Sequence, residues 1–190
     1  MRLVFATHNP NKMKEIKQLL PDTIELLSLN DIGCDEDIEE TADTIDGNAI
    51  LKAKYVSEKY GYDCFADDTG LEVKALNGEP GVFSARYAGE HKNNDANIAK
   101  LLENLEDKLD RSASFKTVIA LSLNEHETLF TGICEGEITK KKRGEKGFGY
   151  DPVFLPKDKT QTFAEMEPQE KNEISHRARA FSQLVSYLSE

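Results

Sequence analysis

The chain has 190 residues, of which 38% are hydrophobic and 31% are charged, and its formal net charge at pH 7 is −11. This composition is typical of a globular protein and excludes an intrinsically disordered chain. The excess of negative charge argues against a protein that binds nucleic acid or a membrane surface by electrostatic attraction.

The ends and the cysteines of the chain point to a cytoplasmic protein. The apolar stretch at residues 3–6 is too short for a signal peptide or a membrane span. The three cysteines, Cys34, Cys64 and Cys134, are odd in number and lack the spacing of a metal site. We therefore expect reduced thiols and a cytoplasmic location.

Apolar periodicity predicts alternating strands and helices in the first half of the chain. The predicted elements are, in order, a strand at 3–6, a helix that opens at Lys12 and is ended by Pro21, a strand at 22–29, a helix at 46–60 stopped by Gly61, strands at 63–66 and 71–73, and a helix capped by Asp95.

The second half has a different pattern. Two β-rich stretches at 113–123 and 128–138 predict an antiparallel hairpin, and a long polar loop follows at 139–151. A final helix is expected to begin after Ser175. Strand–helix units at both ends of a central hairpin predict an α/β fold with a mixed sheet, formed by a single domain over residues 1–190.

Two adjacent acids, Asp67 and Asp68, follow an apolar stretch and precede Gly70. We expect a buried strand that ends at the acids and a sharp turn at the glycine. Two carboxylates at one strand end repel each other unless a cation or a proton lies between them, and Mg²⁺ prefers such oxygen ligands. The alternative is an ordinary acidic turn, because turns favour Asp and Gly.

The segment between the first strand and the first helix is rich in short polar side chains. Its residues are Thr7, His8, Asn9, Pro10, Asn11 and Lys12. A helix N-terminus favours an anion, and Lys12 adds a full positive charge. The alternative is that Asn9 simply caps the helix.

Three further polar segments add chemistry. The acidic run at 35–40 ends in Glu39 and Glu40, which could complete a metal site or remain solvated surface. Phe148, between two glycines, could stack on a flat base or face the core. His176 and Arg177 open the last helix, where the helix dipole disfavours cations unless an anion or a carbonyl-rich ligand binds there.

Together these segments resemble the inosine triphosphate pyrophosphatase family, the non-canonical purine nucleoside triphosphate pyrophosphatases. The resemblance covers nearly the whole chain and is carried by seven motifs. They lie at residues 7–12, 39–41, 48–53, 66–71, 80–87, 147–152 and 175–177.

The resemblance implies a fold, an activity and partners. The fold would be an elongated mixed β-sheet flanked by helices, with the nucleotide in a cleft between two lobes. The enzyme would be a homodimer that uses Mg²⁺ to hydrolyse ITP, dITP and XTP to the monophosphate and pyrophosphate. Its biological role would be to cleanse the nucleotide pool.

The resemblance also implies roles for individual residues. Asp68 would be the general base and a metal ligand, and Glu39 a second ligand, although Glu40 remains an alternative. Residues 7–12, Thr69 and Lys171 would hold the substrate, largely by its phosphates. The purine would be contacted by Phe148, Gly149, Tyr150, Asp151, His176 and Arg177.

Two features depart from the family pattern, and two rival functions remain. Many relatives have Gly at the position of His8 and Ser at that of Thr69, so the role of His8 is open, whereas Thr69 keeps its hydroxyl. One rival is a Maf-type pyrophosphatase acting on pyrimidine triphosphates. The other is a nucleotide sensor without catalysis, which release of pyrophosphate would exclude.

Overall fold

The structure is a computed structural model that describes residues 1–189. The chain divides into two compact units. The first unit comprises Met1–Asp68, Thr117–Gly132 and the last segment from Arg177, and the second comprises Thr69–Lys116 and Ile133–His176. In the part of the chain described, none of the helices is both long and apolar enough to cross a membrane.

Seven strands form one mixed sheet in the order β2-β1-β3-β5-β6-β7, with β4 paired to β3. The strands are β1 (Arg2–Phe5), β2 (Glu25–Leu27), β3 (Cys64–Val73), β4 (Pro80–Gly81), β5 (Ser112–Leu123), β6 (His126–Ile138) and β7 (Phe154–Pro156). β1 runs parallel to β2 and β3, whereas β4 is antiparallel to β3 and β7 is antiparallel to β6. The predicted mixed sheet is confirmed.

Five α-helices accompany the strands. They are α1 (Pro10–Lys17), α2 (Ile45–Tyr60), α3 (Asn94–Asn104), α4 (Pro168–Ile174) and α5 (His176–Leu188). α2 ends at Gly61, whose φ of 70° is left-handed and suits glycine. This stop and the start of α5 directly after Ser175 confirm the sequence predictions.

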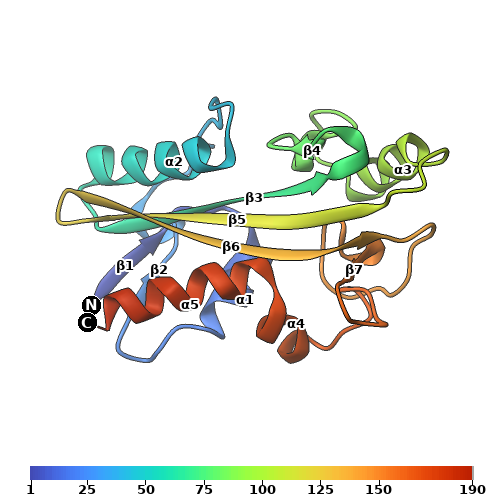
Figure 1. Cartoon of the computed structure of the whole chain (residues 1–190). Helices are drawn as coiled ribbons and strands as arrows, with labels where there is room; N and C mark the ends of the chain where they lie inside the picture. Colours follow the sequence, from blue (N-terminus) through green and yellow to red (C-terminus); the bar gives the residue numbers. More distant parts are fainter. Residues whose placement is uncertain (190) are drawn as a thin grey trace. The chain divides into compact units, whose positions relative to one another are not determined.

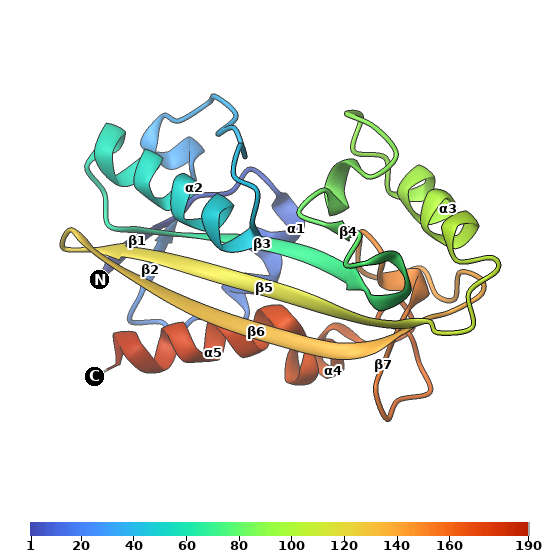
Figure 2. The same cartoon turned by 45° about the horizontal axis from the view of Figure 1, so that its top comes forward.

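In the first unit, α2 covers one face of the sheet and α1 and α5 cover the other (Figures 1 and 2). Successive residues of β3 alternate between these two layers. Cys64 and Ala66 pack in the cluster that contains α2. Phe65 lies on the opposite face, where its ring stacks on Phe5 at 4.6 Å and contacts Phe181 of α5 at 5.8 Å.

The second unit has its own aromatic core. Phe115 of β5 packs against Phe154 of β7 with ring centroids 4.6 Å apart, and Phe154 lies 5.1 Å from Phe163. Ile98 and Leu101 of α3 belong to the same buried cluster. The two units therefore each bury an apolar core, which holds the polar segments of that unit in place.

The prediction of two separate strands around a turn at Gly70 is wrong. β3 runs unbroken from Cys64 to Val73, and Gly70 lies inside it. Pairing with β4 at Leu71 and Glu72 keeps the chain extended past the acids. Asp67 and Asp68 therefore lie within a strand and not at its end.

Three helix starts also differ from prediction. α1 begins at Pro10, two residues before the predicted start at Lys12. The N-cap of α3 is Asn93, whose side chain accepts a hydrogen bond from the backbone of Ala96, and not Asp95. α4 was not predicted, although its start carries a recognisable signal. Glu167 and Glu170 form a capping box around Pro168.

Candidate active site

Asp67 and Asp68 point to opposite faces of the sheet in the first unit. This follows from the alternation of β3, in which Phe65 and Asp67 share one face and Ala66 and Asp68 share the other. The expectation that the two carboxylates flank one shared cation is therefore corrected. Each acid has its own surroundings.

Asp67 is 2% exposed and is neutralised by cations of the protein itself. Its Oδ1 accepts a hydrogen bond from Lys12 Nζ at 3.0 Å, and its Oδ2 lies 3.4 Å from Arg177 Nε. Burial alone would raise its pKa, but Lys12, Arg177 and Lys52 together hold that pKa well below the usual range. Asp67 therefore stays ionised.

Arg177 bridges two carboxylates on this face. Its guanidinium also donates to Glu15 Oε2 at 2.5 Å, and the residue is 2% exposed. Burial disfavours its charge, but Glu15 and Asp67 more than compensate and raise its pKa. The sequence indicated that a cation in the first turn of α5 needs an anion nearby. In the structure, side chains of the protein itself provide such anions.

Asp68 lies on the α2 face and is 7% exposed. Burial raises its pKa from 3.8 to about 6, and the negative charges of Glu40 and Asp67 act in the same direction. Lys52 and Lys12 act in the opposite direction. A carboxylate whose pKa lies near neutral pH is suited to accept a proton as a general base.

Lys52 lies in the motif at residues 48–53, but no role was predicted for this lysine. Its Nζ donates to Glu40 Oε1 at 2.6 Å and to the backbone oxygen of Asp67 at 2.7 Å. It is 7% exposed. The signal was available, because Lys52 lies on the same buried stripe of α2 as Ala49, Ala53 and Val56.

The two glutamates proposed as alternative metal ligands differ in their surroundings. Glu39 is exposed, whereas Glu40 is half-buried. Glu40 forms an ion pair with Lys52, and its negative charge raises the pKa of Asp68. Among residues 1–189, no group of three or more His, Cys, Asp or Glu side chains is arranged to hold a metal ion. One or two carboxylates suffice for Mg²⁺ when substrate phosphates complete its coordination, so the residues present fit that ion.

The polar segment before α1 combines two environments. Asn9 Oδ1 accepts hydrogen bonds from the backbone of Asn11 at 2.9 Å and Lys12 at 3.3 Å, so Asn9 does cap the helix. Lys12 points to Asp67. The segment also borders a cavity of about 580 Å³.

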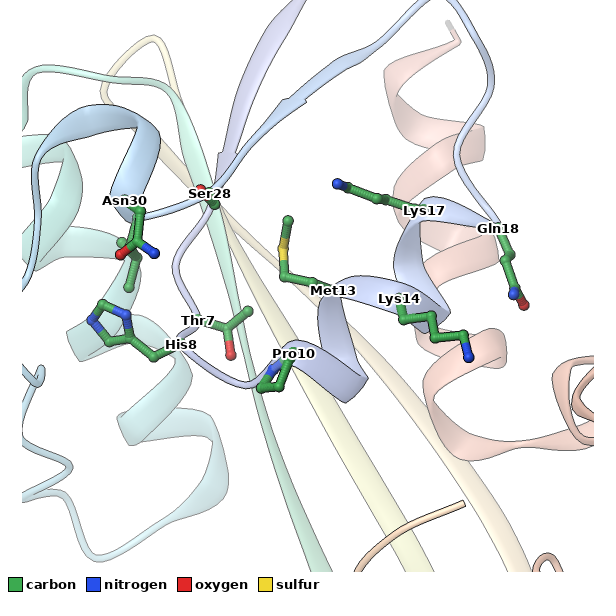
Figure 3. A pocket seen from close by; sticks show the side chains of 10 residues that line it. Thr7, His8, Pro10, Met13, Lys14, Lys17, Gln18, Ser28 and Asn30 are labelled. Atoms are coloured by element: carbon green, nitrogen blue, oxygen red, sulfur yellow. The ribbon is translucent and has the colours of Figure 1, made fainter. Parts of the chain in front are cut away.

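Figure 3 shows the side chains around this cavity, with His8 next to Asn30 and with Met13 and Lys17 projecting from α1. The lining residues are Thr7, His8, Pro10, Met13, Lys14, Lys17, Gln18, Ser28, Leu29 and Asn30. His8 also bonds through its Nε2 to the backbone oxygen of Glu36 at 3.0 Å.

The residues predicted to contact the purine lie in the second unit, near a buried ion pair, except Arg177, which belongs to the first unit. Lys171 Nζ lies 2.8 Å from Asp151 Oδ2, and both side chains are about 5% exposed. The same Asp151 oxygen accepts a hydrogen bond from the backbone of Phe148 at 3.0 Å. Lys171 Nζ lies 5.0 Å from the centre of the Phe148 ring. The pair therefore fixes the turn that carries Phe148.

Tyr150, from the glycine-rich turn, and His176, from the start of α5, both face the protein core. Tyr150 is 5% exposed and its hydroxyl donates to the backbone oxygen of Ser84 at 2.6 Å, so it belongs to the core of the second unit. His176 is 3% exposed and its ring stacks on Phe115 at 4.5 Å. Thr69, which follows Asp68 in β3, is half-buried.

The structure thus brings the predicted residues into two groups. The group in the first unit contains Lys12, Asp67, Asp68 and Arg177, to which Lys52 and Glu40 are added. The group in the second unit contains Phe148, Asp151, Lys171 and His176. The unit boundaries fall between Asp68 and Thr69 and between His176 and Arg177, within the predicted motifs.

Comparison with known proteins gives full-length matches. The chain is 67% identical to a dITP/XTP pyrophosphatase of Christiangramia forsetii, with 100% of both chains covered. It is 61% identical to the enzyme of the same name from Flavobacterium johnsoniae, over 100% of this chain and 98% of the relative. The resemblance drawn from the motifs is confirmed.

Solved structures agree. A HAM1 protein from Coxiella burnetii matches with a TM-score of 0.93 and 45% identity over 100% of this chain and 98% of that one. The Ham1 protein of Staphylococcus aureus matches with a TM-score of 0.91 and 42% identity, also over 100% and 98%. The model of the Ham1 family matches residues 3–187, and the chain belongs to that family.

Proposed function

We propose that this protein is a Mg²⁺-dependent nucleoside triphosphate pyrophosphatase that converts ITP, dITP and XTP to the monophosphate and pyrophosphate. The observation that carries the proposal is Asp68, a buried carboxylate with a pKa of about 6. The positive charges of Lys52 and Lys12 favour its ionised form. The names of the full-length relatives, dITP/XTP pyrophosphatase, support the substrate class.

Asp68 is the proposed general base. It orients a water molecule and takes its proton while the water attacks the α-phosphorus, and pyrophosphate leaves. Asp68 and Glu39 are the proposed ligands of Mg²⁺. When bound, Mg²⁺ supplies positive charge that offsets the charge of the phosphate oxygens.

Two lysines are suited to meet the phosphates. Lys12 is held by Asp67, and Lys52 is held by Glu40 and the backbone of Asp67. Burial lowers the pKa of Lys12, and the carboxylate of Asp67 works against that effect. An incoming polyanion would favour the charged forms of both lysines in the same way.

The purine is the proposed source of selectivity. Phe148 offers a ring for stacking, and its position is set by Asp151 and Lys171. Donors from Arg177, His176 and backbone amides would pair with the carbonyl at the 6-position of hypoxanthine or xanthine. The amino group of adenine would leave buried donors unmatched, at a cost of about 1–3 kcal/mol each.

We further propose a homodimer in the cytoplasm. Phe83 is 63% exposed, a large apolar side chain that a subunit interface would cover. The three cysteines are buried and form no disulfide in the described structure, which suits a reducing compartment. Light scattering after size-exclusion chromatography tests the dimer.

Initial rates of pyrophosphate release on a panel of nucleoside triphosphates, with Mg²⁺ and with a chelator, test the function. We expect ITP, dITP and XTP to be hydrolysed with Mg²⁺, and ATP to be hydrolysed on the order of a thousandfold less efficiently. Comparable efficiency with ATP would refute the proposed base recognition. Binding of ITP without release of pyrophosphate would instead indicate a sensor.

The variant Asp68→Asn tests the base. We expect it to lose turnover but to keep measurable nucleotide binding, because the amide cannot accept the proton. Glu72→Gln is the matched control, since Glu72 is a half-buried acid of the same strand. Near-normal turnover in Asp68→Asn would remove the assignment.

A further inference from the structure

The acidic segment, Asp35–Glu40, and the residues that follow it lie along α2 and are fastened to it at three points. At the far end, Ala42 donates its backbone N–H to Asn48 Oδ1 at 2.9 Å. In the middle, Glu40 binds Lys52 at 2.6 Å. At the near end, Glu36 binds the last two turns of the helix. The segment therefore runs antiparallel to α2.

Glu36 receives more donors than a solvated surface acid needs. Its Oε1 accepts hydrogen bonds from the hydroxyls of Tyr55 at 2.6 Å and Tyr60 at 2.8 Å, and from Lys59 Nζ at 2.5 Å. The bond from Lys59, followed by those from the two tyrosines, holds the pKa of Glu36 well below its usual range. Three donors on one oxygen fix the position of this side chain.

The backbone of Glu36 is fastened as well. Its carbonyl oxygen accepts a hydrogen bond from His8 Nε2 at 3.0 Å, which requires that this ring nitrogen carry the proton. His8 belongs to the segment between β1 and α1, next to Thr7 and Asn9. Glu36 thus joins that polar segment, the acidic segment and α2, and it gives His8 a structural role.

We propose that Glu36 is a positioning residue that holds Glu39 and Glu40 where Mg²⁺ is bound. This inference rests on the proposed function. Glu39 lies between the fastened residues Glu36 and Glu40, so its backbone has little freedom to move. A metal ligand binds well only when outer partners hold it in place, and loss of such partners typically weakens metal affinity 10- to 100-fold.

The competing interpretation is that the cluster around Glu36 is a half-exposed surface ion pair of small energetic worth. The two interpretations differ in what they predict for metal binding. A positioning residue changes the affinity for metal, whereas a surface ion pair changes at most the stability.

The first experiment compares Glu36→Gln with Asp37→Asn. Asp37 is exposed and lies one residue further along the same segment, so its variant removes the same charge without removing the fastening. Binding of Mn²⁺ without nucleotide, followed by electron paramagnetic resonance of the free ion, reports metal affinity directly. We expect Glu36→Gln to bind Mn²⁺ on the order of tenfold more weakly than the wild type, and Asp37→Asn to bind nearly as well.

Hydrolysis gives a second measurement. The Mg²⁺ concentration for half-maximal rate should rise on the order of tenfold in Glu36→Gln, whereas kcat at saturating Mg²⁺ should stay within about twofold of the wild type. A fall in kcat with unchanged metal dependence would overturn the proposal. Absence of pyrophosphate release in the wild type would contradict the proposed function and leave the Mn²⁺ measurement to decide this inference.

A second variant keeps the charge of Glu36 and removes two of its donors. Tyr55→Phe combined with Tyr60→Phe should weaken Mn²⁺ binding in the same direction as Glu36→Gln, and it carries the test if the latter does not fold. Mn²⁺ affinity equal to that of Asp37→Asn in the folded variants would refute the positioning role.

Discussion

Replacing Asp68 by Asn should change how the stability of the protein depends on pH. The native pKa of Asp68 is about 6 and its ordinary value is 3.8, a gap of roughly two pH units. Between these values the native state keeps a proton that the unfolded state has released. Raising the pH through this window therefore costs the wild type roughly 3 kcal/mol, at about 1.4 kcal/mol per pH unit.

The Asn variant cannot ionise and escapes this cost. We expect its free energy of unfolding, relative to that of the wild type, to increase by roughly 3 kcal/mol between pH 4 and pH 7. The measurement is urea unfolding across this range in the presence of a chelator, so that bound metal does not contribute. A difference between variant and wild type that is the same at pH 4.5 and pH 7 would refute the raised pKa of Asp68.

The neighbouring acid provides the contrast. The pKa of Asp67 is held below its ordinary value of 3.8, so its ion pairs contribute stability that is present above that value and is lost only at lower pH. Asp67→Asn should therefore destabilise the protein by about 3–5 kcal/mol, and by nearly the same amount across pH 4.5 to 7, because Asp67 makes only the smallest contribution to the pKa of Asp68. A loss that varies strongly within this window would contradict the assignment of the two environments.

Three further outcomes are expected. Lys171→Met should destabilise the protein by about 3–5 kcal/mol in urea unfolding, because it leaves Asp151 charged and buried, and a second change, Asp151→Asn, should restore part of the loss. Gly147→Ala should raise KM for ITP and lower the free energy of unfolding by more than about 1 kcal/mol. The reason is that φ of Gly147 is +73° and an added Cβ would lie 2.0 Å from Asp151 Oδ2. Unchanged KM and stability would count against this geometry. Glu40→Gln should move the acid limb of kcat/KM to lower pH, because the charge of Glu40 raises the pKa of Asp68; a move to higher pH would contradict that coupling.

The sequence alone predicts much of the fold, where the signals are local. The apolar stripe and Gly61 predict α2, and Ser175 marks the start of α5. The strand through the paired acids was predicted to break, because Asp and Gly are turn residues. Pairing with β4 overrides that local preference, and such pairing is not visible in the local pattern.

The sequence points to Asp68 and Lys12 as candidate site residues, but it does not predict which side chains contact each other. The sequence related both acids to one shared cation, whereas in the structure Asp67 contacts Lys12 and Arg177. These contacts join residues 55 and 110 positions apart, which no local pattern encodes. The position of Lys52 on the buried stripe of α2 is visible in the sequence, but its partners, a backbone carbonyl and a loop carboxylate, are not.

Because β3 is unbroken, the side of the sheet on which each acid lies depends on the number of residues that precede it in the strand. Deleting the one residue between Phe65 and Asp67 would move each acid to the opposite layer of the sheet. Asp67, the ionised partner of Lys12 and Arg177, would then lie on the side of Lys52. A turn could absorb such a deletion, whereas a paired strand cannot. Substitutions around the acids should therefore be tolerated far better than any change in the length of this strand.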